Sequence, residues 1–138
     1  SPYVQSLLNV CFSIFKNELF DPIFGDSAFE LIELVILSMN ARFVPFLTRF
    51  LPEIFEVFKT LEAEDAFDGH MLHHLSILKI FFGCFYIDPT TTLQFLKENQ
   101  FTGTFLQLWI KYSDDFQSVY GCKLQILAAL RILCDADI

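Results

Sequence analysis

The chain has 138 residues, of which 54% are hydrophobic and 17% aromatic, and it contains 18 phenylalanines but only 19% charged residues. Because ordinary soluble domains carry about 25% charged residues, this composition predicts a chain that buries much of its surface, as repeats within a longer array do. The net charge of −8 and the pI of about 4.6 argue against nucleic-acid binding through a basic patch. They favour basic partners, although an acidic surface also serves solubility alone.

The 4 cysteines share no C-x-x-C spacing, and each falls in an apolar helical run. They are Cys11, Cys84, Cys122 and Cys134. We predict buried, reduced thiols, without a disulfide framework or a metal site. No signal peptide is visible at Ser1-Pro2, and we expect a segment of a longer protein. The longest mostly apolar run, Leu75 to Ile87, is shorter than the roughly 20 residues of a membrane span, so we expect no membrane insertion.

Helical periodicity begins at the N-terminal end of the chain, and strand signals are nearly absent throughout. The apolar spacing predicts a first helix over residues 3–19. Ser27 and Glu30 have the spacing of a capping box, in which the hydroxyl and the carboxylate satisfy the first free N–H groups of a helix. We therefore expect a second helix to begin at Ser27.

Prolines mark the next segment. We interpret Pro52 as the opening residue of a third helix that runs to about Leu61, after a short helical lead-in from Phe43. A single helix kinked at Pro52 is the alternative, because proline damages a helix interior. An acidic loop over residues 62–69 is expected next, followed by a fourth helix over residues 70–87.

Helix caps organise the C-terminal half of the predicted structure. Asp88 is a candidate N-cap, with Pro89 at the first helical position. A further short helix is predicted over residues 101–112. Asp114 is expected to cap a last helix that runs to about Cys134.

An internal repeat links these helices. A shift of 44 residues places Ala28 on Leu72 and Leu31 on Leu75, and helix pairs with a period of about 40–47 residues are typical of HEAT and armadillo proteins. We therefore predict an all-α chain, a HEAT-repeat α-solenoid of antiparallel helix pairs. Within a single run over 1–138, we expect a helix of a preceding repeat at 3–19, one repeat at 27–61, the next at 70–112, and the first helix of a further repeat at 116–134. The residues expected to be buried between repeats are Leu31, Leu34, Val35, Leu75, Leu78, Phe82, Leu127 and Leu130.

No constellation of residues predicts catalysis. His70 and His74 have the spacing of two zinc ligands in an H-E-x-x-H helix, but Met71 stands where the glutamate would be. Exposed histidines at the start of a helix are the favoured interpretation. The 5 glycines are scattered, so no phosphate-binding loop is predicted. We expect no enzyme activity, no catalytic or cofactor-binding residues, no cofactor and no metal.

An acidic run is the strongest candidate for a binding surface. Its carboxylates lie within sixteen residues and are opposed only by Lys59. They are Glu53, Glu56, Glu62, Glu64, Asp65 and Asp68. A solvated helix face followed by a charged loop is the alternative interpretation. Spacing alone does not separate the two.

Several short patterns resemble a known family. They are the acidic, leucine-rich run over 26–37, Phe85-Tyr86-Ile87-Asp88-Pro89 with the leucine run over 93–96, and the series Phe105, Trp109, Asp114, Phe116 and Lys123-Leu124. Together they are similar to the C-terminal HEAT repeats of karyopherin-β (importin-β superfamily) nuclear transport receptors, in the branch of importin-seven and importin-eight. One departure is Tyr120-Gly121-Cys122, where the family often has His-Asp before the lysine.

The resemblance implies a non-enzymatic receptor that carries protein cargo through nuclear pores under the control of the GTPase Ran. It implies a protein of cytoplasm and nucleus that contacts nucleoporins and basic cargo. In such receptors the second helix of each repeat lines the concave face, which here means residues 52–61 and 89–112, and the main Ran site lies in N-terminal repeats that this chain would lack. The alternative is a HEAT or armadillo scaffold subunit with no transport role.

Overall fold

The computed structural model describes residues 2–18, 24–64, 71–116 and 118–135, and this part of the chain is all-helical, with no strand. The α-helices are α1 (Pro2–Glu18), α2 (Phe24–Met39), α3 (Leu47–Glu64), α4 (Met71–Ile87), α5 (Pro89–Glu98), α6 (Thr102–Tyr112) and α7 (Val119–Asp135). Two 3₁₀ helices, η1 (Asn40–Phe46) and η2 (Ser113–Asp115), connect some of them. The all-α prediction is therefore confirmed.

The predicted cap at the start of α5 is present. The Asp88 carboxylate accepts hydrogen bonds from the Thr91 backbone N–H at 3.1 Å and from the Thr91 hydroxyl at 2.7 Å. Pro89 occupies the first helical position, where its missing N–H costs nothing. This short polar sequence fixes the place where α4 ends and the chain turns into α5.

The end of α5 is a Schellman motif that lacks the usual glycine. The N–H of Phe101 donates to the Leu96 carbonyl at 2.8 Å, and the N–H of Gln100 donates to the Lys97 carbonyl at 3.1 Å. Gln100 has φ 54°, a left-handed conformation that costs a residue with a Cβ about 1–2 kcal/mol. Phe101 and Leu96 are both buried, and this apolar pair accompanies the motif.

Two predicted caps are wrong. Since α2 begins at Phe24, Ser27 lies inside the helix and does not cap it. Asp114 belongs to η2, and α7 begins only at Val119. The Ser118 hydroxyl instead accepts from the Gly121 N–H at 2.9 Å, which is the geometry of an N-cap.

Pro52 does not open a helix. It is the sixth residue of α3, and the lead-in is the 3₁₀ helix η1, which contains Pro45. The alternative of one helix running through Pro52 is the better description. Because Pro52 is exposed, its ring faces solvent and displaces no core side chain.

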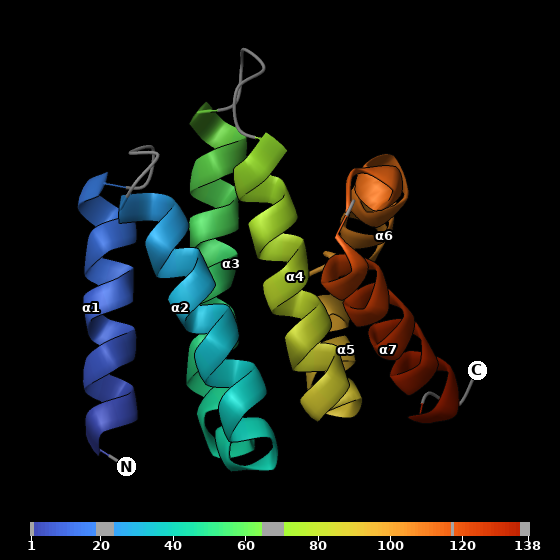
Figure 1. The fold of residues 1–138 in the computed structure, drawn as a ribbon, viewed down its shortest axis with the longest axis horizontal. Coiled ribbons are helices and arrows are strands. Elements are labelled where there is room, and N and C mark those ends of the chain that lie inside the picture. Colours follow the sequence, from blue (N-terminus) through green and yellow to red (C-terminus); the bar gives the residue numbers. More distant parts are fainter. Residues whose placement is uncertain (1, 19–23, 65–70, 117, 136–138) are drawn as a thin grey trace.

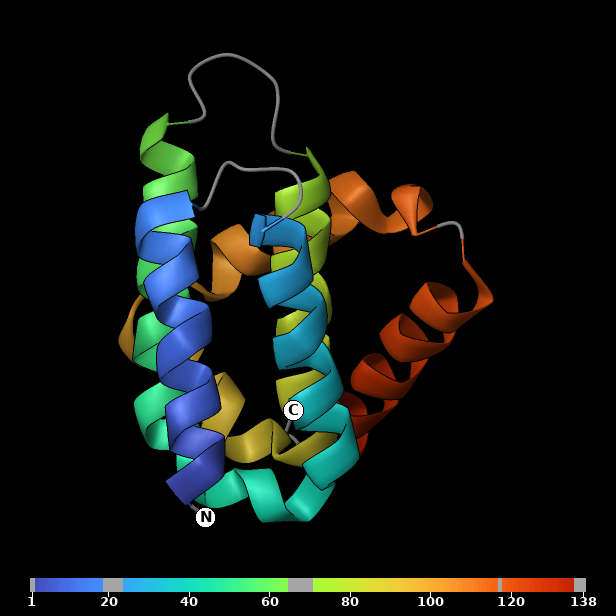
Figure 2. The ribbon, with the colours of Figure 1, turned by 60° about the vertical axis from the view of Figure 1, so that its left-hand side comes forward.

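The helices stand in two layers. The helices α1, α2, α4 and α7 lie next to one another in chain order, since α2 contacts both α1 and α4, and α4 contacts α7 (Figure 1). Behind them, α3 contacts α1, α4 and α5 (Figure 2). The chain reverses direction at η1, so α2 and α3 are antiparallel, whereas α1 and α3 run in the same direction (Figure 1).

Aromatic contacts join helices at both ends of the described part of the chain. Phe12 of α1 lies against Phe50 of α3, with ring centroids 5.8 Å apart. At the other end Phe82 of α4 contacts Trp109 of α6 at 4.7 Å and Phe116 at 5.5 Å. Aromatic pairs of this kind contribute about 0.5–1.5 kcal/mol beyond their area, which gives the high phenylalanine content a structural role.

The predicted core is partly right. Leu75, Leu78 and Phe82 are buried, and a Cβ on Gly83 would lie only 3.3 Å from the Ile36 methyl, so this glycine allows α4 to approach α2 closely. Of the other predicted core positions, Val35 and Leu127 are half-buried and Leu31, Leu34 and Leu130 are exposed. On α2 the buried residues are instead Ala28, Phe29, Ile32 and Ile36. Because α2 is apolar almost all round, its sequence does not show which face turns inward.

One run in the described residues, Ser27–Ala63, contains a stretch long and apolar enough for a membrane span, with mean hydropathy 1.5. The prediction that no apolar run is long enough for a membrane span is therefore wrong. In the fold this run comprises α2, η1 and α3 and turns back on itself at η1 (Figure 2). The 16 residues of α2 extend for about 24 Å, less than the roughly 30 Å of a bilayer core.

Candidate protein-binding surface

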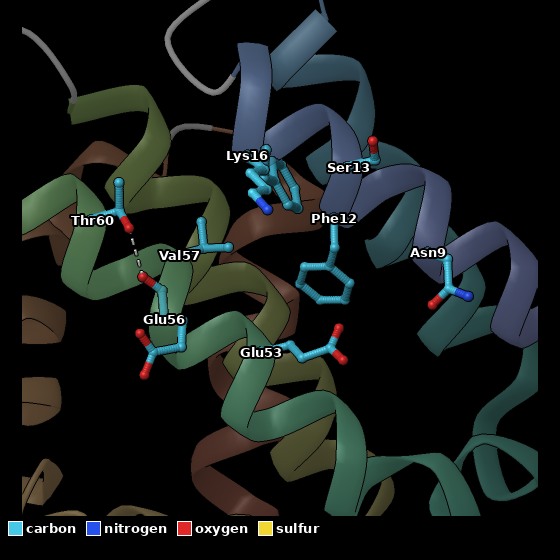
Figure 3. A pocket seen from close by; sticks show the side chains of 9 residues that line it. Asn9, Phe12, Ser13, Lys16, Glu53, Glu56, Val57 and Thr60 are labelled. Atoms are coloured by element: carbon cyan, nitrogen blue, oxygen red, sulfur yellow. Dashed lines mark hydrogen bonds between the residues drawn. The ribbon is translucent and has the colours of Figure 1, made fainter.

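A groove of about 580 Å³ lies between α1 and α3 (Figure 3). Each helix contributes residues spaced at i, i+3, i+4 and i+7, which share one helix face. The groove is lined by Asn9, Phe12, Ser13, Phe15 and Lys16 of α1 and by Glu53, Glu56, Val57 and Thr60 of α3. Its volume is in the range of ordinary ligand pockets.

The sequence of α3 explains why its carboxylates face the groove. The buried residues of this helix follow the spacing of three and four that defines one apolar face, and they include Phe50, Ile54, Phe58 and Leu61. Glu53 lies outside that face and is exposed, and Figure 3 shows its carboxylate beside the ring of Phe12. The packing of α3 therefore fixes the orientation of this acidic side chain.

The charges along the groove are unequal. Glu56 forms an ion pair with Lys59, one turn further along α3, and both side chains are more than half exposed. Such a surface pair contributes less than about 1 kcal/mol, so Glu56 is available to another cation. Within the described part of the chain, the Glu53 carboxylate has neither a hydrogen bond nor an ion pair. Lys16 is the one cation among the lining residues.

The structure places the predicted acidic residues at different sites. Glu53 and Glu56 share the α3 wall of the groove, whereas Glu62 binds His74. Glu64 is the last residue of α3, and its side chain is not described. Asp65 and Asp68 lie outside the described residues. The acidic surface that the structure defines is therefore a pair of carboxylates at a groove, and Glu62 belongs to a separate contact with the buried His74.

His74 is buried, contrary to the prediction of exposed histidines. Its Nε2 lies 2.8 Å from the Glu62 Oε1, and its ring stacks on Tyr112 with centroids 5.8 Å apart. This contact joins α3 to α4 and to the end of α6. His70 lies outside the described residues. Among the described residues there is no cluster of three or more side chains able to hold a metal ion.

Two smaller cavities lie on the α2 side of the molecule. The first, about 300 Å³, is apolar and lies between α1 and α2, with Tyr3, Leu7 and Leu34 in its lining. The second, about 280 Å³, lies where Glu33 of α2 meets Tyr120 of α7. Burial raises the pKa of the Glu33 carboxyl. Burial and the neighbouring Glu33 raise the pKa of Tyr120 to about 12.

Two of the four thiols are buried and two are exposed. Cys11 and Cys84 are buried, and burial raises the pKa of both. Cys122 and Cys134 are exposed, which corrects the prediction that all four thiols are buried. Both lie on α7, the helix at one end of the row.

Sequence reasoning found the acidic wall of the groove but missed the wall formed by α1. The signal was the polar series Asn9, Ser13 and Lys16, which recurs every three or four residues beside the apolar stripe. That series marks the exposed face of α1. Only the packing of α1 beside α3 brings this face opposite the carboxylates.

Comparison with known proteins gives no relative: no family model matches the chain, and neither a curated protein nor a solved structure matches it.

Proposed function

We propose that this chain is a segment of a karyopherin-β nuclear transport receptor that binds basic protein cargo and moves between cytoplasm and nucleus. In this proposal the helices are HEAT-like repeats of an α-solenoid, and the protein is a binding protein without enzymatic activity or cofactor. Ran and nucleoporins act through the complete receptor. The chain neither binds nucleic acid directly nor inserts into a membrane.

The single observation that carries the proposal is the acidic α3 wall of the groove. Glu53 and Glu56 are exposed on a helix of the second layer, beside an aromatic side chain. An acidic surface on a chain of net charge −8 attracts basic proteins and accelerates their association. The resemblance implies that the second helix of each repeat lines the concave face, and α3 is that helix in the predicted repeat over 27–61.

The order of the helices supports the solenoid interpretation. In a solenoid each unit contacts mainly its neighbours along the chain. Here α1, α2, α4 and α7 lie in chain order in one layer, with α3 and α5 behind (Figure 1). A bundle closed around one centre would instead bring the first helix against the last.

A HEAT or armadillo scaffold without a transport role is the second candidate, and the surface of α7 favours it. Ile126, Leu130 and Leu133 are exposed at a spacing of four and three residues, so they form an apolar stripe. Exposed apolar surface of this kind marks contacts with other proteins. A subunit permanently held in a large complex would cover such a stripe.

The test is a pull-down that uses the full-length protein containing this chain and Ran loaded with either GTP or GDP. A transport receptor should retain Ran with GTP and lose it with GDP, and Ran-GTP should change the affinity for cargo through linkage between the two sites. A scaffold subunit should ignore both nucleotide states. Equal retention of the two Ran forms, or of neither, would refute the transport role.

A further inference from the structure

We propose that the groove between α1 and α3 binds a short extended peptide segment that inserts an apolar side chain against Phe12 and places a lysine or arginine at Glu53. The inference rests on the proposed role in protein binding but not on control by Ran. It adds to the basic cargo that the resemblance implies a place for the cation and an apolar side chain beside it.

The dimensions of the groove limit what enters it. Its walls extend from Asn9 to Lys16 on α1 and from Glu53 to Thr60 on α3, which is about 10 Å along each helix. An extended peptide advances about 3.3 Å per residue, so about three residues fit between the walls.

The floor of the groove is apolar. Phe12 is half-buried, and its ring is held from below by Phe15 and Phe50, with centroids 5.8 Å away in each case. Val57 continues the floor on the α3 side. A pre-formed apolar floor favours an inserted side chain, because little conformational order is lost on binding.

Charge decides which segment fits. Both glutamates belong to the α3 wall, but only the Glu53 carboxylate turns toward Phe12, whereas that of Glu56 points away from α1 (Figure 3). Lys16 lies on α1 towards the other end of the groove. Glu53 has no partner among the described residues, so an incoming cation need not displace an internal one. A cation beside an apolar residue therefore complements the groove, whereas an acidic residue at the same place is repelled.

The experiment measures binding of three short, capped, fluorescein-labelled peptides to the 138-residue chain by fluorescence anisotropy. The first peptide alternates lysine and leucine. In the second, serine replaces leucine, and in the third, glutamate replaces lysine. The lysine–leucine peptide should bind most tightly, and added salt should weaken its binding.

Two variants and one control locate the site. Glu53→Gln keeps the shape of the side chain and removes its charge, so the Kd for the lysine–leucine peptide should rise about three- to fivefold. Glu98→Gln makes the same change of charge on α5 and should leave the Kd unchanged. Ser13→Trp fills the groove from an exposed position and should raise the Kd by about tenfold or more. Circular dichroism verifies that each variant is folded.

Each other result overturns the proposal. Equal binding of the serine peptide means that the apolar floor is not used. Equal effects of Glu53→Gln and Glu98→Gln mean that only the overall charge matters. If the chain dimerises and Ser13→Trp dissociates the dimer, a second copy occupies the groove. Loss of peptide binding with retained binding of Ran-GTP by the full-length protein would reject this site and leave the proposed function standing.

Discussion

Truncation of two leucines, one buried and one exposed, tests the packing of the helix layers. Leu78 of α4 is 2% exposed and belongs to the main core, whereas Leu34 of α2 is 61% exposed. Both residues occupy apolar positions on apolar helices, and the sequence alone suggests that both are buried. The structure predicts very different costs for Leu78→Ala and Leu34→Ala.

The two magnitudes follow from burial. Truncating a buried leucine to alanine removes about three carbon-sized groups from the core and leaves a cavity, which together cost about 2–5 kcal/mol. For Leu34 most of the side chain already contacts solvent, so the transfer cost is about 1 kcal/mol at most. The slightly better helix propensity of alanine offsets a few tenths of this cost.

The assay is equilibrium unfolding in guanidinium chloride, followed by circular dichroism. Leu78→Ala should lower the midpoint strongly at an unchanged m-value, and Leu34→Ala should move it little. Leu37→Ala, on the same helix as Leu34 and half-buried, should fall between them. A cost for Leu34→Ala equal to or above that of Leu78→Ala would refute the orientation of α2 described above.

Three further predictions concern the end of α5, the Tyr120 phenol and the four thiols. Gln100→Gly should stabilise the protein by about 0.5–1 kcal/mol in thermal unfolding, because glycine adopts the left-handed conformation without the strain that a Cβ causes. Gln107→Gly, inside α6, should instead cost about 1 kcal/mol. Destabilisation by both variants would contradict the Schellman geometry. Since the pKa of Tyr120 is raised to about 12, the folded state binds the phenol proton more tightly than the unfolded state does, so the resulting stabilisation of the fold is complete below pH 10 and is lost as the pH rises towards 12. Ultraviolet titration should show that Glu33→Gln lowers the pKa of Tyr120. An unchanged titration would disprove the interaction between Glu33 and Tyr120. Ellman's reagent should label the two exposed thiols of the native protein rapidly and reach Cys84 only after unfolding. Rapid labelling of all four thiols would contradict the burial of Cys11 and Cys84.

The sequence predicted the end of a helix correctly where that end depends on local chemistry. Asp88 and Pro89 form the cap that their order indicates, because the carboxylate and the backbone N–H groups lie within one turn of each other. The capping prediction at Ser27 was wrong for the opposite reason. A serine and a glutamate three apart also occur inside helices, and α2 already begins at Phe24.

The candidate site was predictable only on one side. The spacing of Glu53 and Glu56 placed both carboxylates on one face of a helix, as the structure has them. The sequence also grouped Glu62 with them, because nothing local shows that this carboxylate turns to a buried histidine on α4. A contact between residues twelve positions apart, across two helices, depends on how those helices pack.

Sequence by itself determined that this protein is helical, rich in buried aromatic residues and acidic, since helical periodicity, composition and charge are properties of the chain. Tertiary structure alone decided which faces became core, groove and exposed surface. The reason is physical. Because α2 and α7 have apolar residues on several sides, the free energy of burial is similar whichever face of the helix turns towards the core. The face that is buried is set by the packing of neighbouring helices, for example by the close approach of Gly83 on α4 to Ile36 on α2.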